Sequence, residues 1–180
     1  MEDLKMINTG DLIVVRKNKS ILGRATQFFT RSPYTHAGIA IWIEGVLYVA
    51  ELNGGRNHLI PIEQLNNYDV YECPEGLTDV RSAIHKWLQK PVDYGYAALF
   101  LIGFLDWFKI KVFVHWRSIM VCSGFCVAIY ETAGWPEHTR VISPAGLASE
   151  LKLKLEVRPQ KKQKAVPVGV ANLKRNLKVK

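Results

Sequence analysis

A cysteine at the start of a predicted helix is the residue in this sequence best suited to covalent chemistry. Cys122 opens the stretch CSGFCVAIY, whose apolar spacing predicts a helix that begins at this cysteine. A sulfur atom at a helix N-terminus lies beside unpaired N–H groups and the positive end of the helix dipole, and both stabilise the thiolate. Cys122 is therefore a candidate nucleophile. Because Ser123 and Gly124 are small, we expect the sulfur to be accessible, and the backbone N–H groups of these two residues are candidates for holding an oxyanion.

A predicted β-hairpin supplies a histidine and an acid that could serve this cysteine. The apolar runs THAGIAIWI and VLYVAEL are separated by Glu44-Gly45, a two-residue connection typical of hairpins. With the turn at this point, Gly38 lies opposite Glu51 and His36 opposite Asn53. Because residues two apart share a face, the side chains of His36, Glu51 and Asn53 point the same way. Glu51 could then orient the imidazole and stabilise the imidazolium, and Asn53 is the alternative for that position because an amide can also serve there.

Each of these residues also has a structural interpretation. His36 could be a core histidine satisfied by a buried acid, and a lone cysteine is more often inert than catalytic. We interpret Cys126 as a small buried hydrophobe and Cys73 as an incidental thiol at a strand end. The catalytic interpretation depends on the combination of thiol, imidazole and acid, which is the pattern of a cysteine nucleophile activated by a base.

The charge of the chain is unevenly distributed. All 16 acidic residues and 16 of the 24 basic residues lie in 1–157, and the remaining eight basic residues lie in 158–180. We therefore expect one neutral domain over 1–157, followed by a basic, mobile tail over 158–180. Such a tail could bind nucleic acid or an anionic membrane surface, which gives a non-catalytic binding module as an alternative function. The tail contains no aromatic residue for base stacking.

Cysteine usage and the N-terminus bear on the compartment. Three cysteines are an odd number and form no disulfide framework, which fits a reducing environment. The first residues lack the features of a signal peptide, so we expect a cytoplasmic protein, or a phage-borne or delivered enzyme that would also lack one. The most apolar window, 97–105, has nine residues where a membrane span needs about twenty, so we expect no transmembrane segment.

The other elements predicted from the sequence would position these side chains. Besides the hairpin, short strands are expected at 11–17, 58–65, 68–73 and 151–157, with Pro61 directing its strand to a sheet edge. Helices are expected at 21–32, 76–90, 94–108, 122–134 and 143–151, with an extended link at 109–116. Thr78 is the predicted N-cap of the second helix, and Gly134 the end of the fourth. Helices and strands in separate blocks predict an α+β fold with a central antiparallel sheet or half-barrel packed against helices.

Several short motifs together resemble a known family. The segments TGDLIVV, SPYTHAGIAI, YVAELNGG and VCSGF follow in this order, and VISPAGLA resembles a closing P-x-x-L-A segment. In sequence and spacing they are similar to the circularly permuted papain-like amidases of the NlpC superfamily, the YiiX/YebB-like kind. The resemblance covers residues 9–157. Ordinary papain-like enzymes have the cysteine before the histidine, whereas His36 here precedes Cys122, as the permuted kind would show.

The resemblance implies a permuted papain-like fold and a cysteine hydrolase acting on an amide or peptide bond, for which cell-wall peptide is one substrate. It suggests Cys122 as the nucleophile, His36 as the general base and Glu51 as the orienting acid, with an acyl-enzyme intermediate. It implies no metal or organic cofactor, and the remaining histidines show no recognisable ligand spacing. The apolar segment 94–108 keeps a second enzymatic alternative open, a thiol acyltransferase or lipid amidase or esterase on an acyl substrate.

Overall fold

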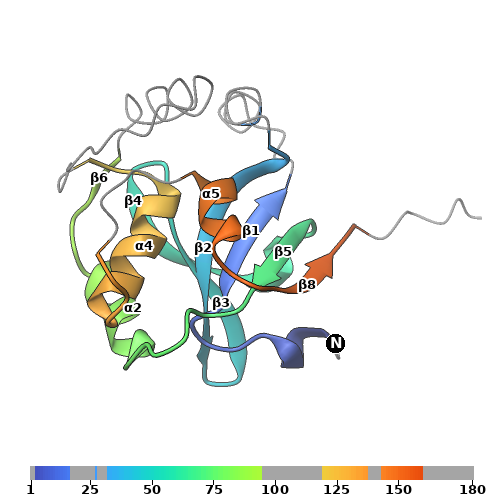
Figure 1. The fold of residues 1–180 in the computed structure, drawn as a ribbon, viewed down its shortest axis with the longest axis horizontal. Coiled ribbons are helices and arrows are strands. Elements are labelled where there is room, and N and C mark those ends of the chain that lie inside the picture. The colour runs from blue at the N-terminus through green and yellow to red at the C-terminus, as the bar shows by residue number, and fades with distance from the viewer. Residues whose placement is uncertain (1–2, 17–26, 28–31, 95–118, 138–142, 160–180) are drawn as a thin grey trace, which may run out of the picture.

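A six-stranded antiparallel sheet forms the centre of the fold (Figure 1). The computed structural model describes residues 3–16, 27, 32–94, 119–137 and 143–159. The sheet has the order β4-β3-β2-β1-β5-β8, with strands β1 (Leu12–Arg16), β2 (Tyr34–Ile43), β3 (Val46–Asn53), β4 (Arg56–Pro61), β5 (Tyr68–Tyr71) and β8 (Leu153–Val157). A separate parallel pair consists of β6 (Asp93–Tyr94) and β7 (Ile119–Met120), and the described 3-10 turns are η1 (Asp3–Met6) and η2 (Ile62–Gln64).

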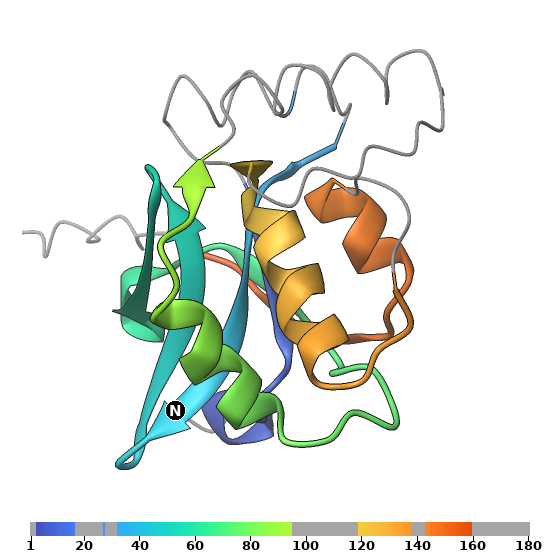
Figure 2. The same ribbon diagram turned by 90° about the vertical axis from the view of Figure 1, so that its left-hand side faces the viewer.

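Three helices pack against one face of this sheet: α2 (Val80–Leu88), α4 (Cys122–Thr132) and α5 (Pro144–Ser149). Figure 2 shows α4 between α2 and α5. The side chains of Ile39 and Ile41 in β2 lie in the core under the helices, whereas Ala40 between them belongs to the core on the opposite face. This alternation is the period of two expected of a strand, and it explains why residues 37–43 of β2 are all apolar.

The hairpin of β2 and β3 has the register expected from the sequence. Ile43 pairs with Val46 and Gly38 pairs with Glu51. The turn residue Glu44 adopts a positive φ of 48°, which suits a tight hairpin turn. The hairpin therefore places Glu51 at the position from which it was expected to approach His36.

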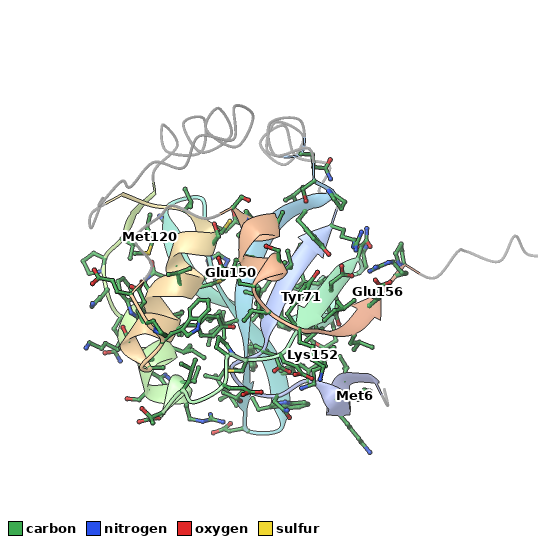
Figure 3. The ribbon with its side chains drawn as sticks, viewed as in Figure 1. Met6, Tyr71, Met120, Glu150, Lys152 and Glu156 are labelled. Atoms are coloured by element: carbon green, nitrogen blue, oxygen red, sulfur yellow. The ribbon has the colours of Figure 1, made fainter. Side chains whose placement is uncertain are left out.

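A cluster around a buried carboxylate joins four strands of the sheet. Asp69 of β5 is fully buried, and Arg16 of β1 donates to its Oδ2 atom through Nε at 2.8 Å. Tyr34 of β2 donates to the same oxygen, and Arg158, just beyond β8, donates to Oδ1. Tyr71 and Glu156, labelled in Figure 3, mark the side of the sheet where these residues lie. We call Asp69, Arg16, Tyr34 and Arg158 the Asp69 cluster.

Most of the predicted elements within the described residues are confirmed. The strands, the helix from Cys122 with Gly134 after its end, and the short helix beginning at Pro144 are present, and β4 with Pro61 lies at a sheet edge. The strand expected at 58–65 ends at Pro61, where the 3-10 turn η2 follows. The predicted N-cap Thr78 is wrong, because Asp79 accepts the hydrogen bond from the Ser82 N–H. The antiparallel sheet with separate helices agrees with the α+β expectation.

Some predicted features lie outside the described residues. These are nearly all of the helix expected at 21–32, the helix expected at 94–108 apart from Tyr94 in β6, the extended link at 109–116 and residues 160–180 of the tail. Arg158, the first residue of the predicted tail, is part of the Asp69 cluster. No helix in the described part of the chain is long and apolar enough to cross a membrane.

Candidate active site

The start of α4 places the candidate nucleophile at an uncapped helix N-terminus. Val121 is extended, with φ −110° and ψ 168°, and Cys122 is the first helical residue. Among the three α-helices described, α2 and α5 have N-cap side chains, Asp79 and Ser143, whereas α4 has no side-chain cap. The first N–H groups of α4 are therefore not occupied by a cap and can stabilise negative charge on the sulfur.

The Cys122 sulfur interacts with the imidazole of His36 and with two backbone N–H groups. These groups belong to Ala37, next to the histidine in β2, and to Ser123, next to the cysteine in α4. Cys122 is only 3% exposed, so the accessible sulfur expected from its small neighbours is not observed. The predicted oxyanion residues Ser123 and Gly124 lie in the first turn as expected, and the Ser123 N–H points toward the sulfur.

His36 bridges the cysteine and the glutamate. Its Nε2 atom lies 2.9 Å from Glu51 Oε2, which leaves Nδ1 as the ring nitrogen for the Cys122 sulfur. The carboxylate can thereby fix the tautomer and orientation of the ring. Thiol, imidazole and carboxylate are brought together from α4, β2 and β3, elements that are far apart in the sequence.

The site lies where β2 and β3 separate. Their backbone pairing ends at Gly38 and Glu51, and His36 instead pairs with Val15 of β1 while Asn53 pairs with Arg56 of β4. The expected position of Asn53 directly opposite His36 is therefore not observed. The amide of Asn53 instead donates to Glu51 Oε1 at 3.2 Å, so Asn53 supports the acid and does not replace it.

Gly38 permits the close approach of the two strands beside the site. A Cβ atom at this position would lie 2.5 Å from Val49 Cγ1 and 2.9 Å from the carbonyl oxygen of Ala50, both far inside van der Waals contact. It would also lie 3.4 Å from the Cβ atom of Glu51. Glycine is thus required for the geometry that brings Glu51 next to His36.

The surroundings of Cys122 and His36 favour a thiolate–imidazolium ion pair. Burial alone would lower the pKa of His36, but the charge and hydrogen bond of Cys122, followed by those of Glu51, outweigh it and raise the pKa to about 10. Burial would likewise raise the pKa of Cys122, and His36 together with the N–H groups of Ala37 and Ser123 lowers it below its ordinary value. The two shifts have opposite directions, so each charge stabilises the other.

The other two cysteines have the surroundings of inert thiols. Cys126 is fully buried, and burial raises its pKa well above the ordinary value. The pKa of Cys73 is raised to about 11, first by burial and then by the nearby charge of Asp11. Cys126 therefore fits its expected interpretation as a buried hydrophobe, and Cys122 differs from both in having a lowered pKa.

Two features of the site were not anticipated from the sequence. His58 of β4 places Nε2 at 3.2 Å from Glu51 Oε1, and the N–H of Ala37 points at the Cys122 sulfur. A turn at Gly54-Gly55 would have predicted His58, because it sets His58 opposite Glu51. The role of Ala37 depends on the docking of α4 against β2, for which the local sequence carries no signal.

The described residues contain no group of three or more His, Cys, Asp or Glu side chains arranged to hold a metal ion. Comparison of the sequence with protein-family models finds no match, and comparison with curated proteins finds no significant match.

Comparison with solved structures defines the class of fold. The mixed helix–sheet architecture, with its six-stranded antiparallel sheet, is that of a YiiX-like fold. One matching structure is the crystal structure of the metalloprotein YiiX from Escherichia coli O157:H7, with a TM-score of 0.61 and 20% sequence identity. The match covers 86% of this chain and 99% of the YiiX chain. At this identity the similarity concerns the fold.

Proposed function

We propose that this protein is a cysteine hydrolase with a permuted papain-like fold, and that it cleaves an amide or ester bond through Cys122, His36 and Glu51. The observation that carries the proposal is the continuous contact from the Cys122 sulfur through His36 to Glu51, at a helix N-terminus. The chain order His36, Glu51, Cys122 and the YiiX-like fold support the permuted arrangement.

In the proposed acylation step, the Cys122 thiolate attacks the carbonyl carbon of the substrate and a carbon–sulfur bond forms. The N–H groups of Ala37 and Ser123, which contact the sulfur, lie close to the reacting atoms and are candidates for stabilising the oxyanion. The leaving amine or alcohol takes a proton from the His36 imidazolium as its bond to the carbonyl carbon breaks. The product is a thioester on Cys122.

In the proposed deacylation step, His36 accepts a proton from water, which attacks the thioester. The carbon–sulfur bond breaks, the acid is released, and the thiolate and imidazolium are restored. Glu51 holds the ring through Nε2 in both steps, so that Nδ1 faces the reacting atoms. An acceptor other than water would give acyl transfer by the same chemistry.

The description of YiiX as a metalloprotein raises the question of a metal at the corresponding place in this chain. The two carboxylate oxygens of Glu51 are held by His36 on one side and by Asn53 and His58 on the other. Among the described residues these side chains do not form a group that could hold a metal ion. The donor set does not fit a metal here, and the proposed steps use only the side chains and backbone named above.

The proposal can be tested by trapping the acyl-enzyme. The full-length protein is incubated with nitrophenyl esters of short and long acids and with a cell-wall muropeptide, and the intact mass is measured after rapid acid quenching. We expect an acyl adduct that peptide mapping assigns to Cys122. Replacement by Cys122→Ala should abolish the adduct, and His36→Gln should slow its formation by about 10²–10⁴-fold, the usual contribution of a positioned base.

The matched control is Cys126→Ala, which removes the neighbouring thiol of the same helix. This variant should form the adduct at the wild-type rate, because Cys126 is buried and its pKa is raised. Turnover of these substrates by Cys122→Ala at the wild-type rate would refute the proposed nucleophile.

A further inference from the structure

A second histidine contacts the candidate triad from the strand next to Glu51. His58 of β4 pairs directly with Glu51 of β3, within a ladder of six antiparallel residue pairs. Its Nε2 atom lies 3.2 Å from Glu51 Oε1. Since facing residues in an antiparallel pair bring their Cβ atoms close together, the backbone pairing fixes this contact.

The carboxylate of Glu51 is held from two sides. His36 occupies Oε2, while Asn53 and His58 occupy Oε1. The Glu51 side chain is only 4% exposed, whereas that of His58 is 42% exposed. An ion pair between two exposed groups contributes little, but here one partner is a buried carboxylate whose rotation would break its bond to His36.

Both ring nitrogens of His58 face oxygen acceptors. Nδ1 lies 3.2 Å from the carbonyl oxygen of Arg56, and Nε2 faces Glu51. The backbone carbonyl at Nδ1 thus orients the ring of His58, which presents Nε2 to the carboxylate of Glu51.

We propose that His58 is a positioning residue of the active site, whose contact with Glu51 Oε1 keeps the carboxylate in place so that Oε2 remains directed at His36. The inference rests on the proposed function for its catalytic meaning, but its physical effect is on the Cys122–His36 ion pair and can be measured without a substrate. His58 acts through Glu51 and does not contact the sulfur.

The titratable side chains that interact with Glu51 come from β2, β4 and α4. Glu51 faces His36 of β2 and His58 of β4, and it interacts electrostatically with Cys126 of α4. Helix α2 meets β4 through Asn57, whose amide donates to the carbonyl oxygens of Trp87 and Lys90. Because Asn57 and His58 are neighbours in a strand, their side chains point to opposite faces, and these bonds do not involve His58.

The experiment measures the pH midpoint at which the Cys122 thiolate forms. The thiolate is monitored by its ultraviolet absorbance in the full-length protein, with Cys122→Ser as the blank. His58→Ala should raise the midpoint by about 0.2–0.7 pH unit, roughly a two- to fivefold loss, which is typical of one polar contact with a partly exposed side chain. His58→Gln should restore most of the wild-type midpoint, because its amide can donate to Oε1.

A double-mutant cycle distinguishes positioning from a local structural effect. In the Glu51→Gln background, His58→Ala should produce no further change in the midpoint, since its route to His36 is gone. An unchanged midpoint in His58→Ala, or an equal shift with and without the Glu51 carboxylate, would overturn the proposal. A failure of the acyl-enzyme test with a normal His58 effect would refute the hydrolase and retain the positioning role.

Discussion

Two buried carboxylates of the same sheet, Glu51 and Asp69, are surrounded by groups of different chemistry. Asp69 is fully buried and is held by two arginines and a tyrosine, whereas Glu51 is held by two histidines and an amide. Arginine stays protonated at any pH at which the protein is folded, but histidine can lose its proton. A permanent charge stabilises a fold, while a proton that can move is what acid–base chemistry requires.

The two carboxylates also lie in different parts of the molecule, Asp69 away from Cys122 and Glu51 beside His36. The Asp69 cluster joins β1, β2 and β5 with the end of β8, whereas the groups that lower the pKa of Cys122 are His36, Ala37 and Ser123. In Figure 3 the labels of Tyr71 and Glu156 are well separated from that of Met120, which precedes the α4 N-terminus by two residues. Glu51 instead lies beside the point where β2 and β3 separate. We therefore expect the same substitution, carboxylate to amide, to have opposite consequences at the two places.

The largest expected effect is that of Glu51→Gln on reactivity. The amide keeps the shape of the side chain but loses the charge that stabilises the His36 imidazolium, so acylation should slow by about 10²–10⁴-fold. The free energy of unfolding should change by less than about 1 kcal/mol, because the amide fills the same volume and can still form hydrogen bonds with His36 and Asn53. Acylation kinetics and urea denaturation of the same preparation measure the two quantities. A large loss of stability with unchanged acylation would reverse the roles assigned to the two carboxylates.

Asp69→Asn should show the converse pattern. The substitution leaves Arg16 and Arg158 without their shared partner, and we expect a loss of about 2–3 kcal/mol in the free energy of unfolding, below the range for fully buried pairs because both arginines are partly exposed. The pH midpoint for the Cys122 thiolate should stay at the wild-type value. Equilibrium urea unfolding and thiolate absorbance provide the two measurements, and a shifted midpoint at full stability would contradict the separation of the clusters.

A smaller effect is expected on the acid side of the stability curve. Burial would raise the pKa of Asp69, but the hydrogen bonds from Arg16, Tyr34 and Arg158 outweigh it and lower the pKa below its ordinary value. The contribution of Asp69 is therefore fully present above about pH 4, the ordinary aspartate value, and is lost as the pH falls through the lower folded value. Asp69→Asn should be less sensitive to acid than the wild type in this range. Parallel acid-unfolding curves for the two proteins would contradict this assignment.

The sequence was most informative where local rules determine geometry. The Glu-Gly turn and the period of two set the register of β2 and β3, which brought Glu51 to His36, and helix rules placed Cys122 at the first position of α4. The same rules could not predict that β2 and β3 separate after Gly38, because this depends on their pairing with β1 and β4. The expected place of Asn53 opposite His36 failed for this reason.

Contacts that depend on the packing of distant elements were beyond local rules. The approach of the Ala37 N–H to the Cys122 sulfur requires α4 to dock on β2 at a particular depth, which is decided by the core between them. The burial of Cys122 has the same origin, since its small neighbours alone would have left it accessible. The position of His58, by contrast, follows from a local rule, because a turn at Gly54-Gly55 sets His58 of β4 opposite Glu51.

The proposed thiolate–imidazolium pair of Cys122 and His36 can be measured directly through the pH dependence of the Cys122 thiolate. The ultraviolet absorbance of wild type is compared with that of His36→Gln between about pH 4 and 10, with Cys122→Ser as the blank for each. If the ion pair exists, the wild-type thiolate persists well below the ordinary thiol pKa of about 8.5, and in His36→Gln it forms only near or above that value. A wild-type thiolate that appears only at this ordinary value, with a midpoint unchanged by the loss of His36, would show that Cys122 and His36 do not form an ion pair.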